Sequence, residues 1–181
     1  MRTYPYNTLA SDVIGFTVSG NVGSNGIEAS YNSILNGTDG REYGYLSEDS
    51  SYEKTVKEAQ NGDTVVSTID LQVQSVVEKY ITQFNEENRS GTTLGSKNTA
   101  VMVMNPQNGE IYACVNVPEF DLNDPFSLSG ESSGLTGAEL QDARNKMWRN
   151  RCINDTYEPG STFKILSLIH ISEPTRRSYI S

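Results

Sequence analysis

The chain has no apolar run approaching the roughly 20 residues that a helix needs to cross a bilayer. Its opening stretch, "MRTYPYNTLASD", also lacks the apolar core of a signal peptide and any helix start signal. We therefore expect the given sequence to begin inside a domain. If the protein is exported, the targeting segment lies outside this sequence.

Basic residues are also scarce, since 14 Lys and Arg face 23 Asp and Glu, for a net charge of −9. This acidic balance, with no basic patch carrying interleaved aromatics, argues against nucleic acid or anionic lipid as a partner. The only two cysteines, Cys114 and Cys152, lack metal-site spacing and are too few for a disulfide framework. We expect them to be thiols in or near the core, and we expect no metal and no cofactor.

Glycine is concentrated between residues 13 and 45, where Asn and Ser accompany it. This density predicts tight turns that need positive φ. A flexible linker is the alternative, but the apolar residues of "IEASYNSIL", residues 27–35, have helical spacing and favour an ordered, loop-rich subdomain. Residues 46–62 are polar and predict an exposed loop or edge. The glycines concerned are Gly15, Gly20, Gly23, Gly26, Gly37, Gly40 and Gly44.

The clearest local signal begins near Val65, where "TVVSTID" is rich in β-branched residues and stops at Asp70, a good helix N-cap. A strand should lead into a helix there, with Glu78, Lys79 and Gln83 in water. The stripe expected to be buried consists of Val73, Val76, Val77, Tyr80, Ile81 and Phe84.

Two further segments complete the expected architecture. The stretch "TAVMVMNPQNGEIYACVNV", residues 99–117, is two apolar runs around a Pro and an Asn-Gly turn, which predicts a β-hairpin. Residues 121–137 should form a loop, and "AELQDARNKMWRN", residues 138–150, a short helix. These elements favour an α+β fold.

Ser161 and Lys164 carry the candidate chemistry, because residues three apart are neighbours on a helix. Pro159 and Gly160 suit a turn into that helix. A serine hydroxyl becomes a useful nucleophile only when a base removes its proton, and a lysine can do so only if its surroundings keep it neutral. The helix N-terminus would add N–H donors for oxyanion charge. The apolar tail that follows was not expected to continue this helix.

The bare Ser-x-x-Lys spacing is weak evidence, since about 0.7 matches are expected by chance in a chain of this composition. A second match, Ser51 and Lys54, lies in a polar stretch without a preceding turn, and we interpret it as solvated surface. A helix N-cap serine beside an exposed lysine is an equally good interpretation of the terminal copy on spacing alone.

The sequence segments around Ser161 and Lys164 favour a catalytic interpretation of the motif. The segment "YEPGSTFK", residues 157–164, resembles the active-site motif of penicillin-binding proteins. "TIDLQVQ", "AVMVMNPQNGEIYACVNVPEFDLN" and "NRCINDTYEPGSTFK" resemble, in order, the start of the transpeptidase domain of class B members. "RTYPYNTLASDVIGF" and "GSNGIEASYNSILNGTDG" resemble the last part of their non-catalytic pedestal domain.

This resemblance implies the end of a β-rich pedestal, residues 1–62, followed by the incomplete start of a transpeptidase domain, residues 63–165. It implies that Ser161 is acylated by a peptidoglycan stem peptide ending in D-Ala-D-Ala, or by a β-lactam, with Lys164 as the base. Arg2 and Glu28 match positions of a structural ion-pair network. The family is membrane-anchored, faces outside the cytoplasm and works with septal or side-wall synthesis partners.

The C-terminal stretch departs from this pattern. The Ser-x-Asn and Lys-Thr-Gly motifs that the family carries after its nucleophile do not follow Ser161, and Ser-x-Asn matches at Ser19, Ser30 and Ser96 are expected noise. Residues 166–176, "LSLIHISEPTR", resemble a translated transposase-type sequencing adapter. We therefore expect residues 166–181 to be non-native and this chain to be inactive alone, and we assign no role to His170, Glu173, Arg176 or Arg177.

Two alternatives remain open at the level of sequence. One is a class D-type serine β-lactamase or β-lactam sensor domain, which shares "STFK" but has no pedestal resembling "RTYPYN" and "GIEASYN". The other is a non-catalytic cell-wall interaction module in which Ser161 is only a cap.

Overall fold

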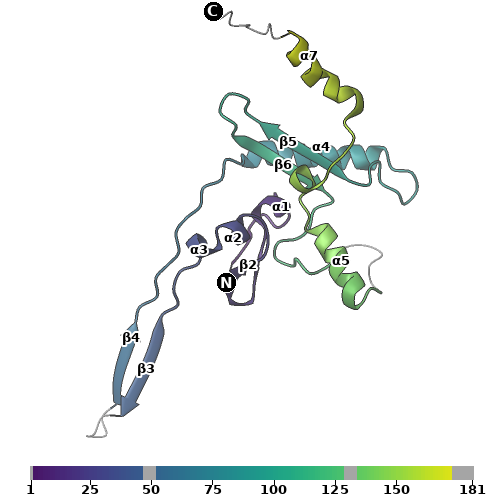
Figure 1. Ribbon diagram of the computed structural model, residues 1–181. Helices are drawn as coiled ribbons and strands as arrows, with labels where there is room; N and C mark the ends of the chain where they lie inside the picture. Colours follow the sequence, from purple (N-terminus) through teal and green to yellow (C-terminus); the bar gives the residue numbers. More distant parts are fainter. Residues whose placement is uncertain (1, 47–51, 129–133, 173–181) are drawn as a thin grey trace, which may run out of the picture.

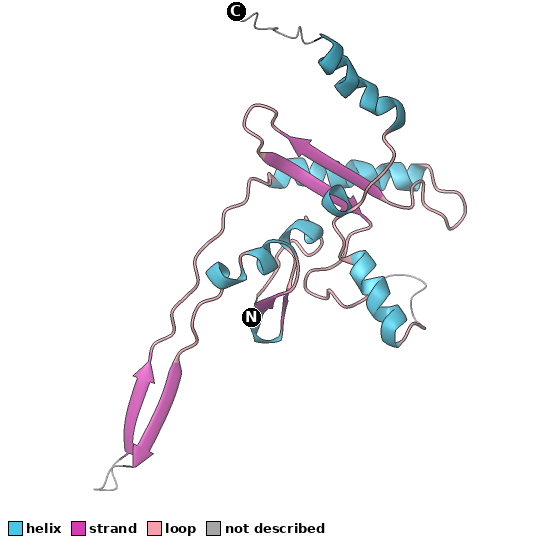
Figure 2. Cartoon of the chain, viewed as in Figure 1, coloured by secondary structure: helices cyan, strands magenta, loops and turns pink. Residues whose placement is uncertain are grey.

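The computed structural model describes residues 2–46, 52–128 and 134–172. Within these residues the strands form three separate two-stranded antiparallel sheets, with short and long helices between them. Two elements project from a central body in opposite directions: a β-ribbon and the C-terminal helix (Figures 1 and 2). The mixture of helices and strands confirms the expected α+β fold.

The N-terminal part is a series of short elements joined by tight turns. Gly15, Gly20 and Gly26 have positive φ, as expected, whereas Gly44 lies within a regular strand. The helix expected at residues 27–35 is present but is broken at Tyr31 into two short helices. The elements are α1 Ser11–Ile14, β1 Thr17–Val18, the 3-10 turn η1 Ser19–Asn21, β2 Val22–Gly23, α2 Gly26–Ser30 and α3 Asn32–Leu35.

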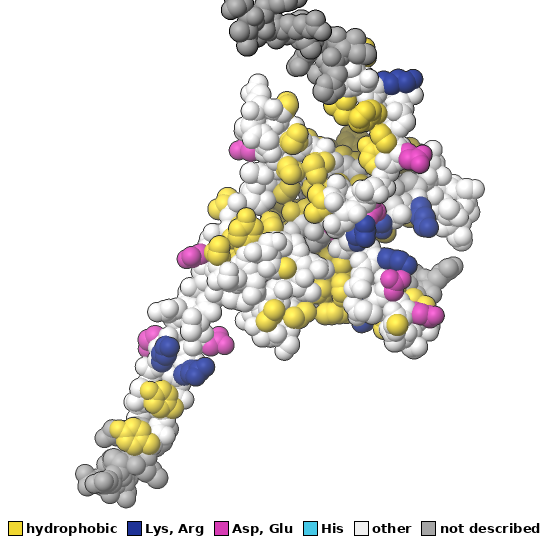
Figure 3. Space-filling model, viewed as in Figure 1, with side chains coloured by type: hydrophobic (Ala, Val, Ile, Leu, Met, Phe, Trp, Pro, Cys, Tyr) yellow, Lys and Arg dark blue, Asp and Glu magenta, His cyan; other side chains and the backbone are white. Residues whose placement is uncertain are grey.

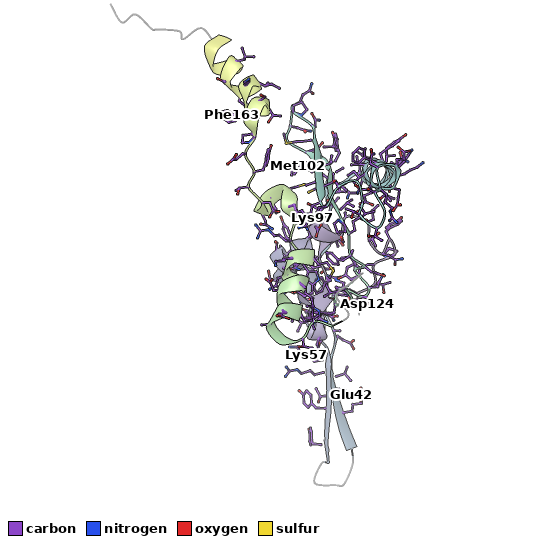
Figure 4. The ribbon with its side chains drawn as sticks, turned by 90° about the vertical axis from the view of Figure 1, so that its right-hand side faces the viewer. Glu42, Lys57, Lys97, Met102, Asp124 and Phe163 are labelled. Atoms are coloured by element: carbon purple, nitrogen blue, oxygen red, sulfur yellow. The ribbon has the colours of Figure 1, made fainter. Side chains whose placement is uncertain are left out.

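A projecting ribbon follows, made of β3 Arg41–Leu46 and β4 Tyr52–Lys57. The backbones of Thr38 and Gln60 exchange two hydrogen bonds of 2.8 and 2.9 Å, so the two legs of the ribbon are paired before they reach the body. Figure 4 shows Glu42 and Lys57 on this ribbon, with Lys57 nearer the body. For residues 46–62 the sequence predicts an exposed loop or edge, which agrees with the exposed strand β4, but it does not predict the strand β3.

The central layer consists of α4 Leu71–Glu87 packed on the hairpin of β5 Thr99–Met104 and β6 Ile111–Val117. The hairpin is confirmed. The helix start is confirmed as well, because the Asp70 carboxylate accepts hydrogen bonds from the N–H groups of Gln72 and Val73, at 2.8 and 2.9 Å.

The strand expected just before Asp70 is wrong. Residues 61–70 form no regular secondary structure, and Val66 is 89% exposed. This segment touches the edge of β6 through the Thr68 hydroxyl, which donates to Ile111 O, and the Asp70 N–H, which donates to Tyr112 O, both at 2.8 Å. A β-branched run becomes a strand only where a partner edge continues beside it, and here the contact with β6 ends after these two bonds.

The apolar stripe expected on α4 is only half correct. Ile81 is buried with Ala113 and Val115 of β6, and Val73 and Val77 pack against this cluster. Val76, Tyr80 and Phe84 are instead exposed. Lys79 and Gln83 are exposed as expected, but Glu78 is half-buried. The helix therefore turns a narrower face to the hairpin than its apolar pattern indicates.

Gln74 explains how α4 is locked to the hairpin. Its buried side-chain amide donates to Cys114 O at 3.3 Å and accepts from Cys114 N–H at 2.9 Å. It therefore pairs with the free edge of β6 as a strand backbone would, and satisfies polar groups that would be costly to bury unpaired.

A second core joins the N-terminal part to the rest of the chain. Phe16 is 1% exposed and packs against Phe120 and Leu122, with Trp148 5.0 Å away between ring centroids. The Trp148 indole donates to Pro125 O at 2.8 Å. Trp148 directly follows α5 Gly137–Met147, the expected short helix, and the described part of residues 121–137 is a loop before that helix, as expected.

Carboxyl groups are buried where the N-terminal part of the chain meets the layer of α4, β5 and β6. Asp12 of α1 is 9% exposed, and its Oδ1 atom has no hydrogen-bond partner. Burial raises the pKa of Asp12 to about 7, although the Arg151 charge opposes this shift. The pKa of Glu119 is raised to about 8, mainly by burial and to a smaller extent by a hydrogen bond with Glu78 and by the charge of Glu78. Glu78 also accepts a 3.1 Å hydrogen bond from the Ala10 N–H, so it links α4 to the N-terminal part.

Because the pKa values of Asp12 and Glu119 are raised, we expect the folded chain to lose stability as pH rises. Because both pKa values are higher in the folded chain, the folded state binds more protons than the unfolded state from about pH 4 to pH 8. Stability should therefore be full near pH 4 and fall by several kcal/mol as pH rises from 5 to 8.5. Urea unfolding at several pH values measures this slope.

The matched control is the double variant Asp12→Asn, Glu119→Gln, which keeps the side-chain shapes without the charges. Its unfolding midpoint should change much less between pH 5 and pH 8.5. If the double variant keeps the full slope, other groups cause the pH dependence.

The ion pair expected between Arg2 and Glu28 is present. Arg2 Nε lies 3.1 and 3.3 Å from the two carboxylate oxygens of Glu28, whose side chain is only 10% exposed. The Tyr4 hydroxyl lies 3.5 Å from the same carboxylate and accepts from the Thr17 N–H at 3.1 Å. The pair therefore fastens the start of the chain to α2.

Breaking this pair should destabilise the chain. We expect Arg2→Glu or Glu28→Arg alone to cost about 2 kcal/mol, because each leaves like charges at a half-buried contact. The double charge reversal should recover part of that loss in urea unfolding. No recovery in the double variant would show that the contact contributes no pairing energy.

Candidate active site around Ser161

Ser161 lies in the 3-10 turn η2 Gly160–Phe163, and Lys164 begins the helix α7 Lys164–Ser172. The Lys164 N–H donates to Ser161 O, so the two residues are held one turn apart along the backbone. Pro159 has helical φ and ψ, and Gly160 has φ of +54°, which completes the turn. The expected juxtaposition of serine and lysine on one turn is therefore present in the backbone.

The helix itself differs from the expectation. The apolar tail was not expected to continue a helix after Lys164, but α7 runs to Ser172. Leucine sustains a helix well, and Ile165, Leu166 and Leu168 are 53–68% exposed. Figure 1 shows α7 leaving the body, and Figure 3 shows hydrophobic side chains exposed near its base and over the neighbouring surface.

The side chains of Ser161 and Lys164 are exposed in this structure. Neither residue lines any of four hollows on the described surface, which are bordered by other segments. Figure 4 shows Phe163, between the two, at the base of α7 and above Met102 and Lys97. In the part of the chain that the structure describes, the side chains of Ser161 and Lys164 are therefore open to solvent.

The segment that leads to Ser161 starts from α6 Arg151–Asn154, which is fixed on the hairpin. Asn150 caps this helix, because its Oδ1 accepts from the Cys152 N–H at 3.0 Å, and it also accepts from Asn116 Nδ2 at 3.1 Å. Asn116 Oδ1 in turn accepts from the Arg151 N–H at 2.9 Å. Two buried asparagines thus fix α6 on β6, six residues before the turn of Ser161. No local pattern in the sequence indicates this long-range amide pair.

The other candidates from the sequence do not form a second site. Lys54 lies in β4 and pairs with Glu42 at 2.9 Å, with its side chain 49% exposed, which confirms a solvated surface. Its sequence partner Ser51 lies outside the described residues. Ser96 donates to Asn85 Oδ1 at 2.6 Å, a structural contact far from Ser161 in the chain. His170 belongs to α7, and Glu173, Arg176 and Arg177 lie outside the described residues.

Within the described residues, no group of three or more His, Cys, Asp or Glu side chains could hold a metal ion. In the same part of the chain, no helix combines the length and apolarity needed to cross a membrane.

Two penicillin-binding protein domain profiles match the chain. Residues 1–65 match the profile of the penicillin binding protein A dimerisation domain, and residues 99–171 match that of the penicillin binding protein transpeptidase domain. Together the two matches cover most of the chain, in the order that the class B resemblance implied. The chain belongs to this family, and the second match includes both Ser161 and Lys164.

Curated relatives agree with the profiles. The chain is 29% identical over 178 residues to the peptidoglycan D,D-transpeptidase FtsI of Buchnera aphidicola, covering 95% of this chain and 27% of that protein. It is 30% identical over 168 residues to the probable peptidoglycan D,D-transpeptidase PenA of Neisseria gonorrhoeae, covering 90% and 25%. The chain thus spans about a quarter of the length of these relatives.

Solved structures share the fold as well. Penicillin binding protein 2X from Streptococcus thermophilus matches with a TM-score of 0.61 and 27% identity, over 91% of this chain and 23% of that one. A peptidoglycan synthetase from Bifidobacterium adolescentis matches with a TM-score of 0.66 and 25% identity, over 93% and 27%.

Proposed function

We propose that this chain is part of a peptidoglycan D,D-transpeptidase in which Ser161 is the acylated nucleophile and Lys164 is its base. The observation that carries the proposal is the backbone turn that sets Ser161 and Lys164 one turn apart, inside the segment that matches the transpeptidase profile. The curated relatives named peptidoglycan D,D-transpeptidases support the same reaction class.

In the proposed reaction, the Ser161 hydroxyl attacks the carbonyl of the penultimate D-alanine of a stem peptide. Its proton passes to the Lys164 amine, and the terminal D-alanine leaves with a proton on its nitrogen. The amine of a second stem peptide then attacks the ester, which forms the cross-link and returns Ser161 to its starting state. A β-lactam would acylate the same hydroxyl, and its opened ring would remain attached.

The arrangement of domains also bears on the alternatives. The dimerisation-domain match at residues 1–65 favours a penicillin-binding protein over a class D-type β-lactamase or a sensor domain, because those classes have no such pedestal. The motif "STFK" alone does not distinguish them. The division at residues 62 and 63, and a non-native tail from residue 166, remain our predictions. The transpeptidase match itself runs to residue 171.

Within the described residues, the side chains of Ser161 and Lys164 are both exposed. We therefore propose that the full-length gene product is the active enzyme and that this chain alone does not turn over substrate. We place the full-length protein at the extracytoplasmic face of the membrane, with septal or side-wall synthesis proteins as partners.

Labelling with a fluorescent penicillin tests the proposal. The full-length gene product should carry covalent label after denaturing electrophoresis, and an excess of unlabelled penicillin added first should prevent it. Absence of label on the folded full-length protein would favour the non-catalytic cell-wall module, in which Ser161 only caps a turn.

A further inference from the structure

The two cysteines of the chain meet in the folded structure, although they are far apart in the sequence. Cys114 belongs to β6 and is 5% exposed, and Cys152 belongs to α6 and is half-buried. Cys114 Sγ lies 3.9 Å from Asn150 Oδ1, the same atom that accepts the N–H of Cys152. Cys152 Sγ also lies 3.8 Å from the carbonyl oxygen of Val115, the residue after Cys114.

Asn150 holds the two thiols in this arrangement. Its Oδ1 accepts from the Cys152 N–H at 3.0 Å, and its Nδ2 lies 3.7 Å from Cys114 Sγ. The hydrogen bonds of Asn116 to Asn150 and to the Arg151 N–H fix the start of α6 on β6. The proximity of the two cysteines is therefore a property of the folded core and not of two flexible side chains.

We propose that Cys114 and Cys152 are a modification site, where a small disulfide oxidant closes an intramolecular disulfide that ties α6, and the segment leading to Ser161, to β6. The proposal does not depend on the transpeptidase reaction. It concerns the only two thiols of the chain and the helix that anchors the path to Ser161.

The chemistry is two thiol–disulfide exchanges. The Cys152 thiolate attacks one sulfur of the oxidant, which forms a mixed disulfide and releases one thiolate of the oxidant. The Cys114 thiolate then attacks Cys152 Sγ, which closes the protein disulfide and releases the second thiolate. The two released thiolates take up the two protons lost by the cysteines, and the two electrons of the protein thiols reduce the oxidant.

Exposure sets the order of these steps. Cys152 is the more accessible thiol, so the oxidant meets it first, and Cys114 acts as the resolving thiol from the core. Burial, together with the neighbouring Cys114 and the Asp12 carboxylate, raises the pKa of Cys152 to about 12. Its thiolate is therefore scarce at neutral pH, and the first exchange should be slow and should accelerate as pH rises.

The test is to equilibrate the 181-residue chain with oxidised and reduced glutathione, with and without urea, and to quantify the species by non-reducing peptide mass spectrometry. The ratio of ring-closed chain to dithiol gives the effective concentration of Cys114 and Cys152 toward each other. In the native chain we expect it to exceed the roughly millimolar value of a flexible linker, and to be at least about tenfold higher than in urea.

Single variants assign the steps. Cys114→Ser should stop at a glutathione mixed disulfide on Cys152, and Cys152→Ser should leave Cys114 largely unmodified until urea is added. Equal effective concentrations with and without urea would overturn the proposal. Mixed disulfide on Cys152 without ring closure, or linked dimers in its place, would overturn it as well.

Discussion

Replacing Ser161 by alanine is expected to abolish covalent labelling of the full-length gene product by a fluorescent penicillin, a loss of about a thousandfold or more in acylation rate. The hydroxyl is the atom that bonds to the lactam carbonyl in the proposed reaction, and Thr162 cannot replace it because its hydroxyl donates to Pro159 O within the turn. The measurement is the rate of label incorporation at fixed penicillin concentration.

Two further variants sharpen this experiment. Ser51→Ala removes the serine of the second Ser-x-x-Lys match and should label at the rate of the unaltered protein. Lys164→Ala keeps the nucleophile and removes the proposed base, so labelling should slow strongly, with the loss in rate and not in final extent. Undiminished labelling of Ser161→Ala would place the acylated residue elsewhere.

Replacing Gly15 by alanine is expected to destabilise the chain by about 4 kcal/mol or more. Gly15 ends α1 with φ of +72°, a conformation that alanine adopts only with strain. A Cβ atom at Gly15 would also stand 1.8 Å from the carbonyl oxygen of Asn25, a backbone atom that cannot move aside as a flexible side chain would. The turn must therefore open, and α1 would separate from α2.

Gly109→Ala is the matched control for this variant. Gly109 has a similar φ of +79° in the turn between β5 and β6, but a Cβ there meets nothing within 4 Å. This change should therefore cost only the backbone strain, about 1 kcal/mol. Urea unfolding followed by circular dichroism compares the two. If both variants lose the same free energy of unfolding, the close approach of Gly15 to Asn25 does not contribute to the effect.

Features that depend on local chemistry could be predicted from the sequence. Asp70 begins α4 because a carboxylate at that position accepts the free N–H groups of the first turn, whatever the rest of the fold is. The hairpin of β5 and β6 follows from two apolar runs around Asn108 and Gly109. The Ser161 turn was predictable for the same reason, because Pro159 fixes its own φ and Gly160 can adopt the positive φ that the turn needs.

Features that depend on distant partners could not be predicted in this way. Residues 64–69 have the composition of a strand, but only two hydrogen bonds join Thr68 and Asp70 to β6. The burial of Asp12 and the pairing of Asn116 with Asn150 join segments more than thirty residues apart, about which local periodicity carries no information. The apolar face of α4 is wider than the surface of the hairpin that covers it, so Val76, Tyr80 and Phe84 remain exposed.

The most direct test of the central claim is to locate the penicilloyl group on the full-length gene product by peptide mass spectrometry after reaction with penicillin. We expect the added mass on the peptide that contains "YEPGSTFK", with fragment ions that assign it to Ser161. An adduct on any other residue, or a folded protein that carries none, would contradict the account.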